Sequence, residues 1–386
     1  MPPRDYRQVL APKLHWYGAG VRCALDASPL LGARTGVATF TAGLLEGLDG
    51  KADISAYALS WRGRSLLREV LPAGVTSGWA VPAGPLLRVW ARTNLVSAER
   101  ILDLVDDVDV VHGTNFVVPP TRSAGRICTV HDLTAVRFPE MCTPTSRRYP
   151  TLVRRAIAGG AWIHTPSAFV AAEVCEAFGA DPARVRAIPH GVTQTNGDPE
   201  AGRKLAVALT GCERYILSLA TVEPRKDLAL LVRAFDDLAG DDGDIGLVLA
   251  GGPGWGSIDE VVDAAFHRDR VGRPGYVSDE DRGALLAGAA AFAFPSRYEG
   301  FGLPPLEAMA AGVPVVASDA GAVREVCGDA ATLVAVGDTD GFAAALAAAL
   351  AHPETAKGRA RVAPLTWDRC GDRMLALYGD AVADRG

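Results

Sequence analysis

The stretch FPSRYEGFGLPPLEAMAAG, residues 294–312, decides the fold of this chain. Its first residues end an apolar strand, and a loop with two glycines follows before Pro304 and Pro305, which are well suited to the first turn of a helix. Gly312 suits the end of that helix, because glycine readily adopts the left-handed conformation found there. The next apolar run, residues 314–318, is predicted to be another strand. This order predicts one strand–loop–helix–strand unit of a parallel sheet.

The same alternation of short apolar runs and amphipathic segments rich in Ala and Leu extends along the chain in both directions. It predicts an α/β protein in which parallel sheets are covered by helices. The predicted strands are residues 21–27, 54–59, 108–112, 126–131, 162–165, 185–188, 215–220, 245–250, 275–277, 291–295, 314–318 and 331–334. The predicted helices are residues 36–48, 147–159, 168–178, 228–239, 258–266, 280–289, 305–311, 341–351 and 367–382.

The length of 386 residues favours two domains, because it exceeds what one ordinary α/β core needs. The segment 194–199 is polar, contains glycine and proline and has no apolar pattern, so we place the linker there. We therefore expect residues 1–195 to form one domain and residues 196–365 a second. Open α/β sheets bind ligands at the carboxyl ends of their strands, so we expect the site in a cleft between the domains.

The composition is typical of a globular protein, with 49% hydrophobic and 22% charged residues. The seven cysteines are an odd number and include no C-x-x-C pair, which favours reduced thiols over a disulfide framework. Because neither a secretion signal nor an apolar run of bilayer length is found, we expect a cytoplasmic protein. Residues 1–195 carry 21 basic and 16 acidic side chains (+5), and residues 196–386 carry 18 and 29 (−11). The basic part would suit an anionic surface or acceptor, although solvated charges would give the same bias.

Two carboxylates lie in the deciding stretch, Glu299 in the loop and Glu307 in the expected first turn of the helix. The neighbouring glycines let backbone N–H groups approach a ligand, and ionised carboxylates accept hydrogen bonds from hydroxyl groups. The unit therefore suits a ligand rich in hydroxyls. Alternatively, Glu307 only complements the helix dipole and Glu299 is solvated. Because both side chains are expected to line a cleft, their replacement should leave folding intact.

Arg225 and Lys226 directly follow the predicted strand 215–220, in a chain that has only five lysines. An arginine gives planar, bidentate contacts to phosphate and a lysine adds a point charge, so the pair could hold a diphosphate. A solvated surface pair would give the same sequence.

His131 ends the predicted strand 126–131, where it could donate a hydrogen bond to a leaving phosphate or to a sugar hydroxyl. A purely structural histidine is the alternative. The turn at residues 32–36, which ends in Gly36, could present amides to phosphate, although such turns are common.

Several familiar sites are missing from the sequence. It has no G-x-x-x-x-G-K-[ST] loop, and the glycine run at residues 251–256 does not have the G-x-G-x-x-G spacing of dinucleotide binding. The Asp107-Val108-Asp109 triplet precedes its strand, so we interpret it as a surface turn, and the seven histidines show no metal-ligand spacing. We expect no metal ion and no cofactor.

Taken together, these residues resemble the retaining glycosyltransferases of family 4, from about Val21 to Tyr378. The most specific mark is the pair Glu299 and Glu307 with seven residues between them, the E-x7-E element of that family. Three further segments match in the same order: Val130-His131-Asp132, Arg225-Lys226, and Gly275-Tyr276-Val277 followed by Ser278-Asp279-Glu280.

The resemblance implies the GT-B fold: two Rossmann-like domains whose parallel sheets face a central cleft, with a last helix (residues 366–386) that crosses back to the first domain. It also implies one role for each matched residue. Arg225 and Lys226 would hold the diphosphate of a nucleotide sugar, and Gly36 would pack under the phosphates. Glu299 would hold the transferred sugar, His131 would reach that sugar, and the amides of Phe301, Gly302 and Leu303 would lie near sugar and phosphate. Glu307 would hold the ribose, and the backbone at Tyr276 and Val277 would read the base.

The segment Val130–Leu133 followed by Phe138-Pro139-Glu140 resembles relatives that use GDP-mannose, so mannose is the first expectation for the transferred hexose. The acceptor would be a hydroxyl of a glycan, a lipid-linked sugar or a small molecule, and nucleic acid is not expected as a partner. A peripheral membrane contact through residues 86–92 and the basic helix that carries Arg147, Arg148, Arg154 and Arg155 is a further hypothesis, although ordinary packing with solvated arginines would give the same pattern. The alternatives are a sugar-nucleotide epimerase of the same architecture and a non-catalytic protein that binds nucleotide sugars.

Overall fold

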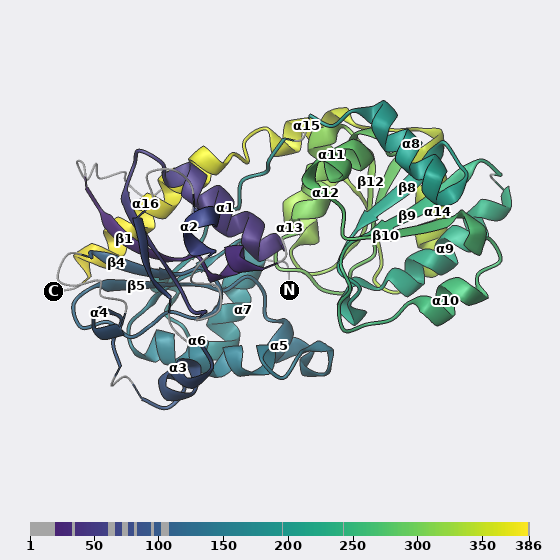
Figure 1. Ribbon diagram of the computed structural model, residues 1–386. Coiled ribbons are helices and arrows are strands. Elements are labelled where there is room, and N and C mark those ends of the chain that lie inside the picture. The colour runs from purple at the N-terminus through teal and green to yellow at the C-terminus, as the bar shows by residue number, and fades with distance from the viewer. Residues whose placement is uncertain are drawn as a thin grey trace.

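The computed structural model describes residues 20–384, except 33–34, 61–65, 72–75, 81–82, 94–95, 102–107, 195 and 242. Within this part of the chain, two parallel β-sheets are each flanked by helices (Figure 1). We refer to residues 20–192 together with the last helix as the first half, and to residues 196–365 as the second half. Of the features discussed from sequence, Ala33, Arg34, Asp107 and Thr195 lie outside the described residues.

The sheet of the first half has the strand order β3-β2-β1-β4-β5-β6-β7. Its strands are β1 (Arg22–Asp26), β2 (Asp53–Ala58), β3 (Thr76–Ala80), β4 (Val110–Gly113), β5 (Gly125–Thr129), β6 (Trp162–Thr165) and β7 (Val185–Ala187). Its α-helices are α1 (Gly36–Leu48), α2 (Leu67–Val70), α3 (Ala83–Trp90), α4 (Ala98–Ile101), α5 (Thr134–Arg137), α6 (Tyr149–Ala158) and α7 (Ala168–Phe178).

The sheet of the second half has the strand order β10-β9-β8-β11-β12-β13. Its strands are β8 (Arg214–Leu219), β9 (Ile245–Ala250), β10 (Val271–Gly275), β11 (Ala291–Phe294), β12 (Val315–Ser318) and β13 (Thr332–Val334). Its α-helices are α8 (Pro199–Thr210), α9 (Leu228–Asp241), α10 (Asp259–Ala264), α11 (Asp279–Gly288), α12 (Leu303–Ala311), α13 (Val323–Cys327), α14 (Thr339–Ala351) and α15 (Ala356–Val362).

Short 3₁₀ turns connect several of these elements: η2 (Ser28–Leu31), η3 (Pro139–Met141), η4 (Ser146–Arg148), η5 (Pro182–Arg184), η6 (Pro224–Lys226), η7 (Arg268–Arg270) and η8 (Gly328–Ala330).

Both sheets are buried on their two faces, which explains the continuous apolar character of the strands. Successive strand residues point to opposite faces: Leu25 packs with α1 and the last helix, whereas its neighbour Ala24 belongs to the core under α6 and α7. In the second half, Leu217 packs with α11 and α12, whereas Ile216 packs with α9 and α14. The α/β class predicted from sequence is confirmed.

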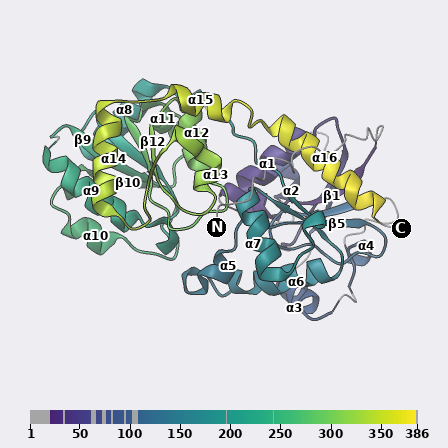
Figure 2. The same cartoon turned by 180° about the vertical axis from the view of Figure 1, so that it is seen from behind.

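The last helix, α16 (Trp367–Ala383), crosses from the second half and packs along α1 in both views (Figures 1 and 2). Glycines allow the close approach: a Cβ on Gly47 would lie 2.1 Å from the carbonyl oxygen of Trp367. Lys51 adds ion pairs to Asp368 (2.6 Å) and Asp372 (2.7 Å). The predicted return of the last helix to the first half is confirmed.

Two predicted elements are displaced. The strand predicted at residues 275–277 is β10, Val271–Gly275, which ends at Gly275 with a φ of +74° and leaves Tyr276 56% exposed. Helix α12 begins at Leu303 after the left-handed Gly302, so Glu307 lies in its second turn and not in the first as predicted. The glycine, and not the proline pair, sets the start of this helix.

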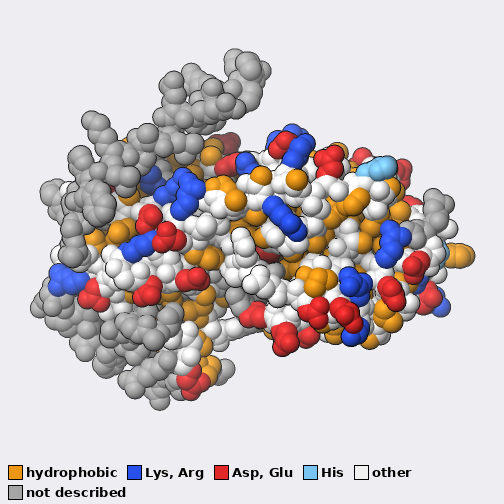
Figure 3. All heavy atoms as spheres, turned by 90° about the horizontal axis from the view of Figure 1, so that it is seen from above, with side chains coloured by type: hydrophobic (Ala, Val, Ile, Leu, Met, Phe, Trp, Pro, Cys, Tyr) orange, Lys and Arg blue, Asp and Glu red, His pale blue; other side chains and the backbone are white. Residues whose placement is uncertain are grey.

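Among the described residues, no helix is both long and apolar enough to cross a membrane. On the face seen in Figure 3, acidic side chains gather along one edge of the second half with basic side chains among them. Residues 196–386, which comprise the second half and the last helix, carry a net charge of −11.

Candidate functional site

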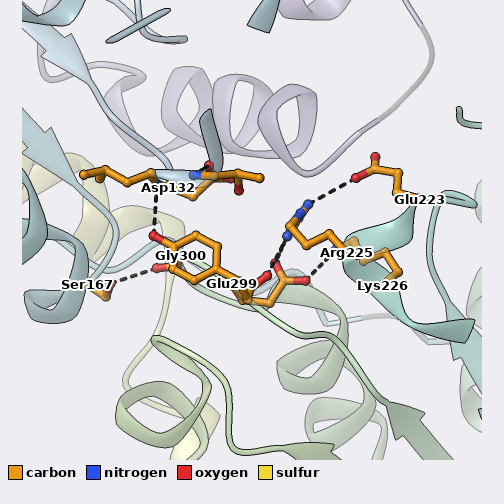
Figure 4. A network of polar contacts seen from close by, with 10 residues as sticks. Asp132, Ser167, Glu223, Arg225, Lys226, Glu299 and Gly300 are labelled. Carbon is orange, nitrogen blue, oxygen red and sulfur yellow. Dashed lines mark hydrogen bonds and ion pairs between the residues drawn. The ribbon is translucent and has the colours of Figure 1, made fainter. Parts of the chain in front are cut away.

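The candidate site lies where neighbouring strands of the second sheet end against the first half (Figure 4). Arg225 and Lys226 occupy η6, the turn that follows β8, and Glu299 lies in the loop that follows β11. Strands β8 and β11 pair directly, so their carboxyl ends bring these three side chains together. His131 and Asp132 follow β5 of the first half and face this loop, since a Cβ on Gly300 would lie 1.8 Å from the carbonyl oxygen of His131.

Glu299 is bonded to both basic residues. Its Oε2 lies 2.8 Å from Arg225 Nη1, and its Oε1 lies 2.6 Å from Lys226 Nζ. The side chains are 9% exposed for Glu299 and 13% for each cation. Arg225 also donates to the carbonyl oxygen of Tyr298 at 2.9 Å and approaches Glu223 at 3.5 Å. We call Arg225, Lys226 and Glu299 the basic cluster.

Glu299 and the two basic side chains stabilise one another's charges, whereas Arg225 disfavours the charge of Lys226. Burial alone would raise the pKa of Glu299, but Arg225 and Lys226 lower it to about 2. Burial and the neighbouring Arg225 lower the pKa of Lys226 despite the attraction of Glu299. Although burial would lower the pKa of Arg225, the carboxylates of Glu299 and Asp132 raise it. Glu299 is therefore ionised at neutral pH, between the two basic side chains.

His131 keeps a hydrogen-bond acceptor on its ring. Its Nε2 lies 2.8 Å from the carbonyl oxygen of Thr114, which can only accept, so Nε2 carries the proton. Burial lowers the pKa of His131, which keeps the ring neutral and leaves the lone pair on Nδ1. The ring can therefore accept a hydrogen bond from a sugar hydroxyl, whereas the donation to phosphate considered from sequence would need another tautomer.

The N-terminus of α12 lies directly after the basic cluster. Gly302 caps the helix with a φ of +100°, a conformation that side chains rarely adopt. Within the described residues, no group accepts a hydrogen bond from the amides of Phe301, Gly302 or Leu303. Phe301 is buried, with its ring 4.8 Å from that of His190. These amides are available to an anion, and the helix dipole favours one.

Glu307 lies apart from the basic cluster and pairs with Arg282 of α11. The Glu307 side chain is only 4% exposed, whereas that of Arg282 is 28% exposed. Helix α11 follows Tyr276 and Val277, so the ion pair connects the expected ribose residue with the segment expected to read the base. Arg282 was not singled out from sequence, because its partner is on another helix.

The remaining sequence-based candidates do not contact the basic cluster directly. Gly36 begins α1 and is exposed, and a Cβ there would meet nothing within 4 Å. Val277 packs against the core of the second half, and Tyr276 is exposed after β10. Within the described residues, no group of three or more His, Cys, Asp or Glu side chains could hold a metal ion.

Several contacts between the halves meet at the site, and sequence analysis missed them. The Tyr298 hydroxyl donates to Glu173 and accepts from the amide of Leu133 at 3.0 Å. Ser167 donates to the carbonyl oxygen of Gly300 at 2.8 Å. Glu325 accepts from two amides at the start of α7, each at 2.8 Å. The halves are therefore in contact around the loop that carries Glu299.

Comparison with known proteins shows which families and structures this chain resembles. A family model described as "Glycosyltransferase Family 4" matches residues 34–195, and one described as "Glycosyl transferases group 1" matches residues 207–363. The chain is 30% identical over 281 residues to "O-antigen chain mannosyltransferase B" of Escherichia coli, which covers 70% of this chain and 74% of that protein. It is 31% identical over 257 residues to the "MMP alpha-(1->4)-mannosyltransferase" of Mycolicibacterium hassiacum, covering 64% of this chain and 58% of that protein.

Among solved structures, the sucrose-phosphate synthase of Thermosynechococcus elongatus superposes with a TM-score of 0.72 at 21% identity. The superposition covers 94% of this chain and 99% of that one. At this identity the likeness shows the fold, which is the two-sheet arrangement described above.

Proposed function

The chain belongs to the glycosyltransferases of family 4, with the GT-B fold, and we propose that it moves a mannosyl group from GDP-mannose to a hydroxyl acceptor with retention of configuration. The observation that carries this proposal is the basic cluster, in which Glu299 is bonded to both Arg225 and Lys226 beside an α12 N-terminus with available amides. Two named mannosyltransferases among the relatives support mannose as the sugar.

The basic cluster supports a diphosphate as the leaving group. The guanidinium of Arg225 and the ammonium of Lys226 supply donors that match phosphate oxygens. The amides of Phe301, Gly302 and Leu303 add partial positive charge from the same side of the second half. Together these groups offer the countercharge that a metal ion supplies in other transferases, so we propose a metal-independent reaction that uses no cofactor.

In the proposed reaction, the bond between the anomeric carbon and the diphosphate oxygen breaks as the acceptor oxygen bonds to that carbon on the same face. The acceptor's hydroxyl proton passes to the departing diphosphate, so atoms and charge balance. Arg225 and Lys226 stabilise the negative charge that grows on the leaving group. Glu299 holds a hydroxyl of the transferred sugar, and His131 accepts a hydrogen bond from another. Glu307 binds the ribose.

A screen of GDP-mannose, UDP-glucose, TDP-glucose and ADP-glucose tests this function. Thermal melting should shift upward most with GDP-mannose, because a ligand that binds the native state stabilises it in proportion to its affinity. Slow release of mannose from GDP-mannose should accompany that shift, and it should be lost in Arg225→Ala. Release of an epimerised nucleotide sugar, or no release from any of the four, would contradict the proposal.

The acceptor is proposed only as a hydroxyl compound: a glycan, a lipid-linked sugar or a small molecule. Cytoplasmic location and contact with the inner membrane face stay predictions. For the latter, Trp90 of α3 is buried and donates its indole N–H to the carbonyl oxygen of Val96 at 2.9 Å. A contact with anionic lipid would therefore depend on the surface arginines and not on this tryptophan.

A further inference from the structure

Asp132 has no role in the reaction proposed above, although it lies at the same site. It follows His131 after β5 and is half-buried. Its Oδ1 accepts a hydrogen bond from the amide of Thr134 at 2.9 Å, which begins the short helix α5. Within the described part of the chain, no group donates a hydrogen bond to its Oδ2. One oxygen of this carboxylate is thus engaged, and the other is available.

The surroundings of Asp132 place it beside the reacting groups. Asp132 and Gly300, the residue after Glu299, lie near each other (Figure 4). A Cβ on Gly300 would lie 3.0 Å from the Cβ of Asp132. The negative charge of Asp132 contributes, after that of Glu299, to raising the pKa of Arg225 against the effect of burial. No ion pair joins Asp132 to Arg225 among the described contacts. The carboxylate therefore lies close enough to act on the charge of Arg225, without an ion pair to it among the described contacts.

The charges around Asp132 limit what can bind there. Glu299 and Glu223 both contact Arg225, so a phosphate or carboxylate next to Asp132 would meet several negative charges. An uncharged hydroxyl is favourable, because an ionised carboxylate accepts hydrogen bonds from hydroxyl groups. The diphosphate of the donor is already assigned to the second half, which leaves this oxygen of the first half to the other substrate.

We propose that Asp132 binds the acceptor: its Oδ2 accepts a hydrogen bond from one hydroxyl of an uncharged sugar or polyol and so turns a neighbouring hydroxyl toward the anomeric carbon. This inference rests on the proposed function. The attacking hydroxyl keeps its own proton for the leaving diphosphate, since Asp132 contacts a different hydroxyl. Acceptors with a phosphate next to the attacking hydroxyl are excluded by the same carboxylate.

A purely local role for Asp132 makes a different prediction. Asp181 accepts from the amide of Ala183 at 2.9 Å with the same two-residue spacing, at an exposed turn of the same half. If Asp132 only starts α5 as Asp181 starts η5, then Asp132→Asn and Asp181→Asn should be equally silent, because the amide oxygen of asparagine still accepts that bond.

The test uses the full chain with GDP-mannose as donor and methyl α-D-mannopyranoside as the probe acceptor. Asp132→Asn should raise the KM for the glycoside by about tenfold or more, since a hydrogen bond to a charged group is lost. Release of mannose to water and the KM for GDP-mannose should not worsen, because the variant removes a negative charge near the diphosphate. Asp181→Asn should match the parent in all three measurements.

An unchanged KM for the glycoside in Asp132→Asn, or an equal loss of mannose release to water, would overturn the assignment. So would a parent chain that releases mannose from GDP-mannose yet neither binds nor glycosylates the probe. Failure of the parent to release sugar from any nucleotide sugar is a separate result, which contradicts the proposed function itself.

Discussion

Glu299 and Glu307 come from one motif, with seven residues between them, but they lie in different environments. Glu299 is held by Arg225 and Lys226, each only 13% exposed, at the contact between the halves. Glu307 is as deeply buried, yet its partner Arg282 reaches solvent. A buried cation that loses its partner is costly, whereas one that reaches water is rehydrated. The two glutamates of one motif therefore have different surroundings, and their loss should affect the stability of the chain to different extents.

This difference changes one expectation from sequence. Residues of the motif were expected to line a cleft, so that their replacement would leave folding intact. The burial of Glu299 between two cations makes it part of the interior of the second half as well as part of the site. We therefore expect a loss of stability in addition to a loss of activity.

The largest effect should follow removal of the carboxylate from the basic cluster. Glu299→Ala removes the carboxylate that pairs with both Arg225 and Lys226, leaves the largely buried Lys226 without an ion-pair partner among the described contacts, and should lower the free energy of unfolding by about 3–5 kcal/mol. Glu307→Ala should cost less, because Arg282 can turn toward solvent. Denaturant unfolding measures both. Adding Lys226→Met to Glu299→Ala should restore part of the loss, and equal losses for the two glutamates would break the comparison.

Acid unfolding tests whether Glu299 is ionised in the folded chain. The pKa of Glu299 is lowered from its ordinary value of 4.5 to about 2 in the folded chain. Its contribution to stability is therefore present above pH 4.5 and is lost as the pH falls toward 2. Glu299→Gln should lack this component of the pH dependence. If the parent and this variant lose stability in parallel over that range, Glu299 is not ionised as described.

Next in size is the effect of the cations on the reaction. Arg225→Ala or Lys226→Ala should lower kcat/KM for the donor by about 10²-fold or more, comparable to losing one donor that stabilises a developing oxyanion. Lysine at position 225 should recover part of the loss, since it keeps the charge without the bidentate geometry. Steady-state kinetics with GDP-mannose decides this, and turnover close to that of the parent would remove the basic cluster from the mechanism.

A smaller effect is expected at the partner of Glu307. Arg282→Met should raise the KM for the donor by about tenfold through loss of one charged hydrogen bond that orients Glu307, with kcat maintained. The matched control is Arg273→Met, because Arg273 pairs with Asp259 at the surface of the same half. A fall in kcat with an unchanged KM would show that Arg282 acts on the reacting centre and not on the ribose end.

The smallest effect is expected from chelation. Transfer should continue in EDTA, because Arg225 and Lys226 provide the countercharge that the leaving diphosphate needs. The measurement is the rate of mannose release before and after dialysis against EDTA. Loss of that rate, with recovery in Mg²⁺ or Mn²⁺, would contradict the metal-independent proposal.

The fold was predictable wherever the apolar pattern was strong. The strand–loop–helix unit around Glu299 and the alternation of strands and helices were predicted in the right order. Strand β10 was misplaced because Gly272, Arg273 and Pro274 give it no apolar pattern, and its pairing with β9 is irregular. Helix α8 was missed although Asp198 and Pro199 form a helix start, since the segment was interpreted as a linker.

The residue types of the site were predictable from the sequence, but the hydrogen bonds and ion pairs between them were not. The sequence indicated a basic pair and two carboxylates, yet the bond between Glu299 and Lys226 joins residues 73 positions apart along the chain. The partner of Glu307 lies on another helix, and the proton of His131 is fixed by a backbone carbonyl 17 residues away. Such contacts leave no periodic signal, so only the folded chain reveals them.

The most direct test of the central claim compares Glu299→Gln and Glu307→Gln in donor-saturation kinetics with GDP-mannose. Interactions made only in the transition state affect kcat, whereas interactions made equally in the ground state affect KM. We predict that Glu299→Gln lowers kcat with little change in the donor KM, and that Glu307→Gln raises the donor KM with little change in kcat. The same pattern in both variants, or the reverse pattern, would contradict the division of roles between the two glutamates.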